Sequence, residues 1–136
     1  MAHDPVTDIQ HYLDAQTTAL TKGTNLFRGP VRAHSAQVPV QSVFVNGYGG
    51  PPPDRVLGTA TEIRYPRVQV TVRSSAYDSG YDLAWTVYNA LQSATPSTTN
   101  TYMDVRVLQS EPNFLEQDKN LHCFWTLNFA VMYQST

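Results

Sequence analysis

The sequence has few of the features that would indicate a metal site, a disulfide framework or a membrane span. Its 136 residues include one cysteine, Cys123, which excludes an internal disulfide and a cysteine-rich zinc site. No apolar run reaches the ~18 residues of a membrane-spanning helix, and the polar start, Met-Ala-His-Asp-Pro, does not resemble a secretory signal peptide. We therefore expect a protein that is made and kept in a reducing compartment, or is released from one by lysis, and that has no membrane partner.

Charge is also scarce. Charged residues make up 15 % of the chain, against ~25 % in a typical soluble domain, and the net charge of −2 argues against a general nucleic-acid binder. Residues 28–73 hold six arginines against two acidic residues, a local charge of +4, whereas residues 75–136 hold two basic against six acidic residues, a local charge of −4. Regions of opposite charge can bind one another between copies of the chain or bind other partners, or their charges can simply be solvated.

Two helices are predicted from the spacing of apolar residues. The first covers residues 4–20, with Asp4 as N-cap and Pro5 at the first helical position. The second covers residues 78–92 and carries a broad aromatic surface, which is most simply the face that covers a sheet. The aromatic residues are Tyr77, Tyr81, Trp85 and Tyr88.

Five strands are predicted, and the clearest alternates three valines with Gln69, Thr71 and Arg73, so one of its faces is polar and basic. Short turns make the last two strands antiparallel. With 41 % hydrophobic residues for one core, residues 1–136 form a single α+β domain, a mostly antiparallel β-sheet flanked by two α-helices. The predicted strands are residues 25–31, 38–45, 65–73, 102–108 and 121–133.

Residues 46–58 are rich in glycine and proline and are predicted to continue neither a sheet nor a helix. The proline run favours an extended polyproline conformation, so this loop is expected to be a stiff protruding arm. Residues 93–101 are predicted to form a polar turn, and residues 109–120 a second loop that ends in a hairpin turn at Asp118-Lys119-Asn120.

The sequence contains no recognisable catalytic, metal or cofactor motif. His122 and Cys123 are adjacent on a strand and point to opposite faces, which spoils a nucleophile–base pair and makes Cys123 a core thiol. Asp78 and Asp82 complement the dipole at a helix start. The glycines of residues 47–50 run into proline, so no helix N-terminus follows to bind phosphate. We expect a protein that is not an enzyme and binds no cofactor.

The motifs together resemble a known family over nearly the whole chain, the tail terminator proteins of long-tailed bacteriophages, also described as minor capsid or tail completion proteins. The most specific part is the Pro-Arg-Val-Gln-Val-x-Val-Arg strand and the helix that follows it. The Gly/Pro arm looks long for the family. The motifs are the N-terminal helix, Val43-Phe44-Val45, Tyr48–Pro53, Tyr65–Arg73, Gly80–Leu91 and Leu127–Val131.

This resemblance implies a structural virion protein of the tail or neck that assembles in the host cytoplasm. Six copies would form a homohexameric ring that caps the tail tube and joins it to the head-side connector or stopper protein. Genomic DNA would pass through the bore without sequence-specific binding. In such a ring one patch on each subunit meets a different patch on the next.

Two sets of residues are candidate contacts under this resemblance. The first would meet a neighbouring subunit or the tail tube, and consists of Phe44, Val45, Tyr48, Gly49, Gly50, Pro51, Pro52 and Pro53. The second would line the bore or meet the acidic half of a neighbour, and consists of Arg64, Arg67 and Arg73.

Three other functions stay open from the sequence. One is another head–tail joining role, as a head-closure or neck protein, which differs only in its neighbours. Another is a small cytoplasmic ligand-binding domain or enzyme with a pocket under the tyrosine-rich helix, which would need convergent polar groups in that pocket. The last is a single-strand nucleic-acid binder that uses Tyr and Arg, against which the net charge of −2 counts.

Overall fold

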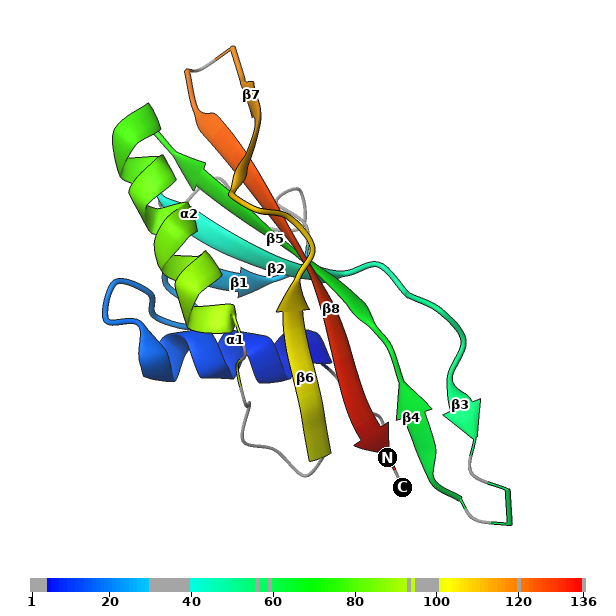
Figure 1. Cartoon of the computed structure of the whole chain (residues 1–136). Coiled ribbons are helices and arrows are strands. Elements are labelled where there is room, and N and C mark those ends of the chain that lie inside the picture. The colour runs from blue at the N-terminus through cyan, green and yellow to red at the C-terminus, as the bar shows by residue number, and fades with distance from the viewer. Residues whose placement is uncertain are drawn as a thin grey trace.

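Two helices lie against one face of a strongly twisted, eight-stranded sheet (Figure 1). The structure is a computed structural model of the chain. It describes residues 5–29, 40–55, 57–58, 60–92, 94, 101–119 and 121–135. The α+β class and the mostly antiparallel sheet predicted from the sequence are confirmed.

The last strand, β8 (Cys123–Ser135), organises the sheet because it is paired along both of its edges. One edge pairs antiparallel with two strands, β5 (Arg67–Ser74) and β4 (Glu62–Arg64). The other edge pairs antiparallel with β6 (Thr101–Val107) and β7 (Asn113–Gln117). The sheet continues outward from β5 to β2 (Ser42–Gly47) and, parallel to it, β1 (Leu26–Arg28), and outward from β4 to β3 (Asp54–Arg55).

Strands β4 and β5 pair with the same edge of β8 in one continuous register, which Pro66 interrupts between them. Arg64 pairs with Tyr133 and Arg67 pairs with Ala130, so the register is the same on both sides of the break. Between them the backbone N–H of Val131 donates to the carbonyl of Pro66 at 2.9 Å. Proline has no N–H to donate in return, which ends the regular ladder at this point.

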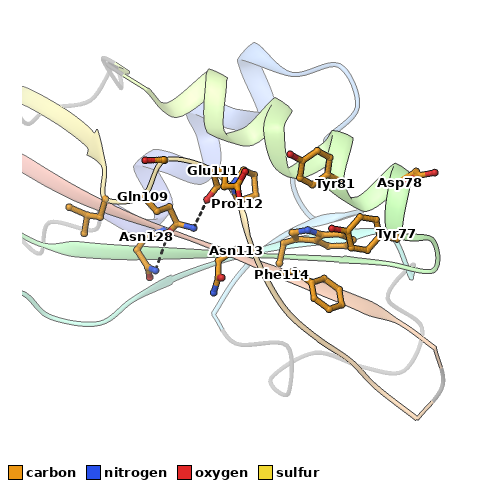
Figure 2. Close-up of a pocket in the computed structure, with 12 residues that line it drawn as sticks. Tyr77, Asp78, Tyr81, Gln109, Glu111, Pro112, Asn113, Phe114 and Asn128 are labelled. Atoms are coloured by element: carbon orange, nitrogen blue, oxygen red, sulfur yellow. Dashed lines mark hydrogen bonds between the residues drawn. The ribbon is translucent and has the colours of Figure 1, made fainter.

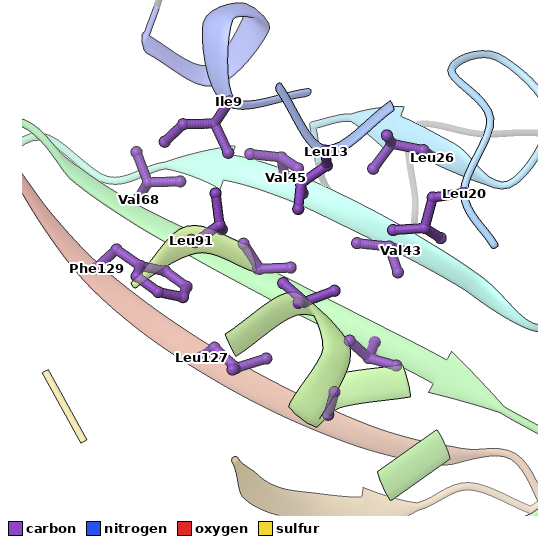
Figure 3. Packing of buried hydrophobic residues seen from close by; sticks show 14 of the residues in the cluster. Ile9, Leu13, Leu20, Leu26, Val43, Val45, Val68, Leu91, Leu127 and Phe129 are labelled. Carbon is purple, nitrogen blue, oxygen red and sulfur yellow. The ribbon is translucent and has the colours of Figure 1, made fainter. Parts of the chain in front are cut away.

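The core lies between the sheet and the helices (Figure 3). The valines of β5 and the odd-numbered residues of β8 from Cys123 to Tyr133 are buried, as their alternation predicts. Helix α1 (Pro5–Gln16) contributes Ile9 and Leu13. Helix α2 (Tyr77–Leu91) covers the sheet with five buried small and aliphatic residues, while its Tyr81 and Tyr88 are partly buried and also pack against the core. These five are Gly80, Leu83, Ala84, Val87 and Leu91.

Several predicted boundaries need correction. Helix α1 ends at Gln16, four residues early, although Leu20 is still buried at 2 % exposed. Strands predicted over 25–31 and 38–45 are shorter or shifted, as β1 and β2. The proposed N-cap Asp4, residues 30–39 and most of the polar turn at 93–101 lie outside the described residues.

The two predicted loops contain strands that sequence periodicity could not detect. Residues 113–117 form β7, whose side chains are all exposed and therefore show no apolar alternation. Residues 46–58 were expected to form no sheet, which is wrong at both ends, since β2 runs to Gly47 and β3 occupies Asp54–Arg55. Strands of two or three residues are too short for a period to appear.

A bulge in β6 places one side chain on the opposite face from the one predicted. Met103 was expected to share a face with Val105 and Val107 in the core. The register shifts between Tyr102 and Asp104, so Met103 is 51 % exposed and Tyr102 packs against the core instead.

Candidate assembly surfaces

The Gly/Pro arm is one side of a long, bent hairpin rather than a free loop. Tyr48 donates its backbone N–H to the carbonyl of Arg67 at 3.0 Å, and Arg67 donates back to Gly49 at 2.9 Å. Gly50 has a φ of +124°, and a Cβ there would lie 2.2 Å from the carbonyl oxygen of Tyr65. Only glycine allows this approach of the two chains.

Beyond the arm, β3 and β4 extend the hairpin away from the helices (Figure 1). Glu62 accepts from Arg55 at 3.2 Å and from Arg64 at 2.7 Å. The hydrogen bond from Arg55 is the main reason why the pKa of Glu62 is lowered. Tyr65 donates to Asp54 at 2.5 Å, which raises the pKa of the phenol. Polar pairs therefore hold a hairpin that has no core beneath it.

The residues predicted to make contacts separate into buried and exposed groups. Phe44 and Val45 are 1 % and 0 % exposed, so both side chains are used inside the subunit. Phe44 stacks on Phe27 with ring centroids 5.7 Å apart. Tyr48 is 48 % exposed, and residues 49–53 are exposed as well. The surface that the arm offers to a partner therefore begins at Tyr48.

The three candidate arginines do not share one face. Arg67 and Arg73 alternate with the buried valines of β5 and lie on the sheet face opposite the helices. Arg64 pairs with Tyr133, a core residue, and so lies on the other face. On the open face, Arg67 and Arg106 flank Ala130 from neighbouring strands, and Arg106 lies 3.3 Å from Asp104.

The two open-face arginines of β5 differ in how tightly they are held. Arg73 donates its Nε to the carbonyl of Val40 at 3.0 Å, and its guanidinium lies 5.6 Å from the ring centroid of Phe44. Partial burial lowers the pKa of Arg73. The Nε of Arg67 is buried and has no hydrogen-bond partner among the described residues, in contrast to the Nε of Arg73.

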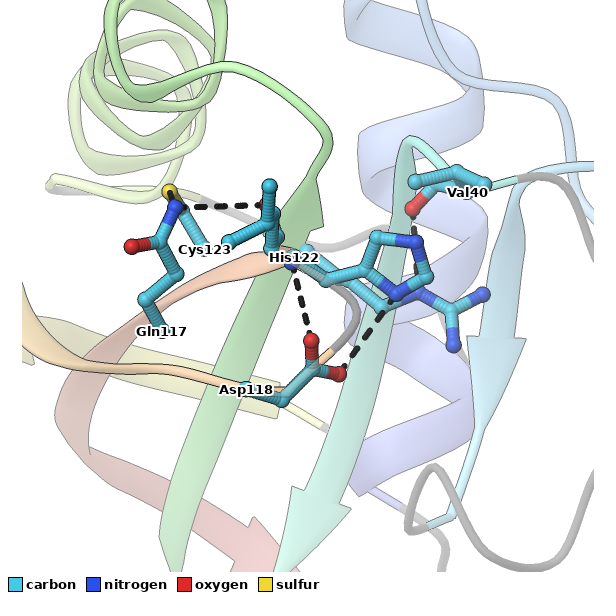
Figure 4. Close-up of polar contacts among 7 residues, drawn as sticks. Val40, Gln117, Asp118, His122 and Cys123 are labelled. Carbon is cyan, nitrogen blue, oxygen red and sulfur yellow. Dashed lines mark hydrogen bonds and ion pairs between the residues drawn. The ribbon is translucent and has the colours of Figure 1, made fainter.

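Near Arg73, the turn between β7 and β8 is fixed by one aspartate (Figure 4). Asp118 accepts from the backbone N–H of His122 at 2.9 Å and lies 3.5 Å from the His122 ring. Gln117 reaches the Sγ of Cys123 at 3.8 Å. Cys123 is free and 3 % exposed, which confirms it as a core thiol.

Between β6 and β7, the side-chain amide of Gln109 makes the hydrogen bonds to the edge of β8 that a strand backbone would otherwise make. Gln109 donates its Nε2 to the carbonyl of Thr126 at 2.9 Å and accepts the N–H of Asn128 at 2.9 Å. Asn128 in turn accepts from Gln69 at 3.2 Å. The backbone groups of β8 therefore keep hydrogen-bond partners where its neighbour changes from β6 to β7. The sequence carried no signal for this role, because Gln109 lay in a predicted loop.

An open groove of about 890 Å³ lies between the start of α2 and β7 (Figure 2). Three aromatic rings pack together there, with centroids 5.1 Å apart for Tyr77 and Trp125, 5.4 Å for Phe114 and Trp125, and 5.3 Å for Tyr77 and Phe114. Tyr77 is 51 % and Phe114 is 42 % exposed. The buried Nε1 of Trp125 has no hydrogen-bond partner among the described residues.

This groove occupies the place where the sequence left open a ligand pocket under the tyrosine-rich helix. The amides of Gln109 and Asn128 line it, but they bond to β8 and to each other. The described residues contain no group of three potential metal ligands. Within the same residues, no helix has the length and apolar character to span a membrane.

Comparison with known proteins identifies the family. A family model described as bacteriophage tail terminator protein matches residues 31–135. Among solved structures, a chain titled as the virion of a native gene transfer agent (GTA) particle aligns with a TM-score of 0.64 and 15 % identity, covering 96 % of this chain and 95 % of that chain. No curated protein matches. The chain belongs to the bacteriophage tail terminator family and is a structural protein of a phage-type tail.

Proposed function

We propose that the protein forms a homohexameric ring that caps the tail tube and joins it to the head-side connector. The observation that carries this proposal is the family match over residues 31–135. Genomic DNA would pass through the bore of the ring, and the assembled protein would sit in the neck of the virion. A head-closure or other neck role is the nearest alternative, and it differs in which neighbour the ring binds.

The arrangement of the subunit supports a ring. A cyclic hexamer needs two different patches on each subunit, one to meet each neighbour. The hairpin of β3 and β4 and the groove beside β7 are two such patches, at opposite ends of the molecule (Figure 1). The exposed arm from Tyr48 to Pro53 is assigned to a neighbour or to the tail tube, without the buried Phe44 and Val45.

The open face of the sheet is assigned to the bore or to a charged interface. Arg67, Arg73 and Arg106 lie on it with no helix above them among the described residues. Amides of Gln69 and Asn128 lie between them. Such a face suits transient contacts with phosphates, which carry no sequence information. Arg64 lies on the opposite face of the sheet, so it is assigned to the hairpin and not to the open face.

The first test is the molar mass of the purified protein, measured by light scattering at several concentrations with and without the tail-tube protein. A mass near six times 15.2 kDa, with rings at the head-proximal ends of tails in electron micrographs, would support the proposal. A protein that stays monomeric and does not bind tail tubes would overturn it. Binding to the head connector alone would favour the head-closure role.

The open face is tested by charge reversal. The double variant Arg67→Glu and Arg73→Glu should impair ring assembly or the passage of DNA, and therefore lower infectivity. The matched control is Arg28→Glu, an exposed arginine at the end of β1. Infectivity equal to that of the wild type in the double variant would contradict the assignment of this face.

A further inference from the structure

We propose that Leu57 of one subunit docks into the groove between α2 and β7 of the next subunit. This inference rests on the proposed ring and names the two patches that meet in it. Leu57 follows β3 in the connection to β4 and is 100 % exposed. An apolar side chain that is fully in water at the end of a protruding hairpin is well placed to be buried by a partner.

The hairpin can present this leucine because it is held in shape without a core. Glu62 bridges Arg55 and Arg64, and Tyr65 is bonded to Asp54. A side chain on a pre-organised element loses less conformational freedom on docking than one on a free loop. The register of β4 on β8 fixes the direction in which the hairpin projects.

The groove offers an apolar surface of matching character. Leu108, Tyr77 and Phe114 line it and are 43 %, 51 % and 42 % exposed. Trp125 forms part of its wall, and its Nε1 lacks a hydrogen-bond acceptor among the described residues.

The rim of the groove is acidic, and an exposed arginine lies close to Leu57 on the hairpin. Asp78 and Glu111 line the groove, and no lysine or arginine is among its lining residues. Arg55 lies two positions before Leu57, and its side chain is 82 % exposed. Docking of Leu57 would bring Arg55 to the acidic rim, where opposite charges favour the correct partner and orientation.

The contact must be made between subunits, because one chain cannot reach its own groove. Trp125 and Asn128 mark the groove near the start of β8, whereas β4 pairs with Tyr133–Ser135 at its end, and the hairpin points further away (Figure 1). A strand rises ~3.3 Å per residue, so the two sites are separated by some tens of ångströms. Head-to-tail contact of unlike patches is the geometry that closes a ring.

Cysteine cross-linking tests the contact directly. The native Cys123 is buried, so any disulfide between subunits must come from the introduced cysteines. We expect Leu57→Cys with Ser110→Cys in one chain to give, on oxidation, a ladder of covalent oligomers up to a closed ring, because Ser110 lines the groove. The matched control pairs Leu57→Cys with Asp14→Cys, at an exposed position of α1, and should give no ladder. Equal ladders in both pairs, or none in the first pair at any protein concentration, would overturn the docking.

Leu57 can be changed without harm to the subunit, since its side chain has no buried contact. Leu57→Asp should raise the concentration at which the ring dissociates by about ten-fold or more, while Leu57→Met should stay within about two-fold. Met103→Asp, at a 51 % exposed position on β6, is the matched control and should also stay near the wild type. An unchanged ring in Leu57→Asp, or an equal loss in Met103→Asp, would overturn the proposal.

The two failures can be told apart by the wild-type protein. If the wild type is a hexamer, but the Leu57→Cys/Ser110→Cys variant gives no ladder and Leu57→Asp leaves the ring unchanged, the docking is overturned and the ring stays in place. If the wild type is monomeric with and without tail tubes, and the cysteine variant gives no ladder, the ring and the docking are overturned together.

Discussion

The two ends of the long β8 strand are built on different physical principles. From Cys123 to Val131, β8 and its partner β5 carry buried residues on every second position, under two helices. From Tyr133 onward, β5 is replaced along the same edge by β4, whose residues are half-buried or exposed and which continues into the exposed β3. One end holds the fold together, and the other end projects a hairpin into solvent.

The difference shows how a small chain divides stability from assembly. The covered end is stabilised by apolar burial, which is not directional and tolerates no gaps. The bare end is held by backbone pairing, ion pairs and a glycine that lets two chains approach. Exposed ion pairs contribute little free energy, so this end is stable only because β8 anchors it.

The strongest test of this division compares a core residue with a hairpin residue. Phe129→Ala removes a side chain that is 0 % exposed, and we expect a loss of about 3–5 kcal/mol in the free energy of unfolding. Leu57→Ala removes a fully exposed side chain, and should change that free energy by less than about 0.5 kcal/mol. Urea denaturation of both variants is the measurement, and equal losses would refute the division.

A smaller effect is expected where α2 meets the sheet. A Cβ at Gly80 would lie 2.3 Å from Trp125 and 2.8 Å from Ser74, so Gly80→Ala overpacks the contact at a cost of about 1–3 kcal/mol. The gain of about 1 kcal/mol in helix propensity offsets part of this cost. Thermal denaturation should show a lower midpoint for Gly80→Ala. Asn89→Ala, at an exposed position of the same helix, should not be destabilised.

The amide that joins the two strands on the edge of β8 should matter by a similar or lesser amount. Gln109→Ala leaves the carbonyl of Thr126 and the N–H of Asn128 without their partner, at a cost of about 1–3 kcal/mol if water cannot replace it. Amide hydrogen exchange should speed up at Asn128. Gln117→Ala, on the exposed β7, is the comparison variant and should leave that exchange rate as it is.

The smallest effect is expected from pH at the bare end. The pKa of Glu62 is below its ordinary value of 4.5 because Arg55 and Arg64 bind the charged form. Their contribution is therefore present above that ordinary value and is lost as the pH falls through the lowered pKa. As the pH falls below 4.5, the protection factors of the β4 amides, which correct for the pH dependence of intrinsic exchange, should decrease while those of β5 are unaffected. Glu62→Gln should abolish the pH dependence, and an unchanged β4 in the wild type would contradict it.

The sequence predicted the parts of the fold whose burial is periodic. The valines of β5, the alternation of β8 and both helices were identified because a covered element repeats its apolar residues with a fixed period. It missed β7 and β4, because their pairing comes from the free edges of β8 and from the long hairpin rather than from burial. The bulge that exposes Met103 was missed for the same reason.

The candidate surfaces were predicted less completely. The sequence identified the arm and the polar face of β5, since glycine, proline and arginine at those positions are unusual in a covered strand. It did not separate Arg64 from Arg67, because Pro66 lies between them and hides the common register on β8. The groove could not be predicted at all, because it joins residues of α2, β7 and β8 that are far apart in the chain.

The sequence by itself determined the fold class, the core and the family, because each follows from local periodicity or from motifs along the chain. The tertiary structure decided which side chains remain outside. Phe44 and Val45 became buried, Leu57 stayed in water, and Tyr77 and Phe114 were brought together around Trp125. Exposure depends on what folds over a residue from elsewhere in the chain, and no local pattern encodes that.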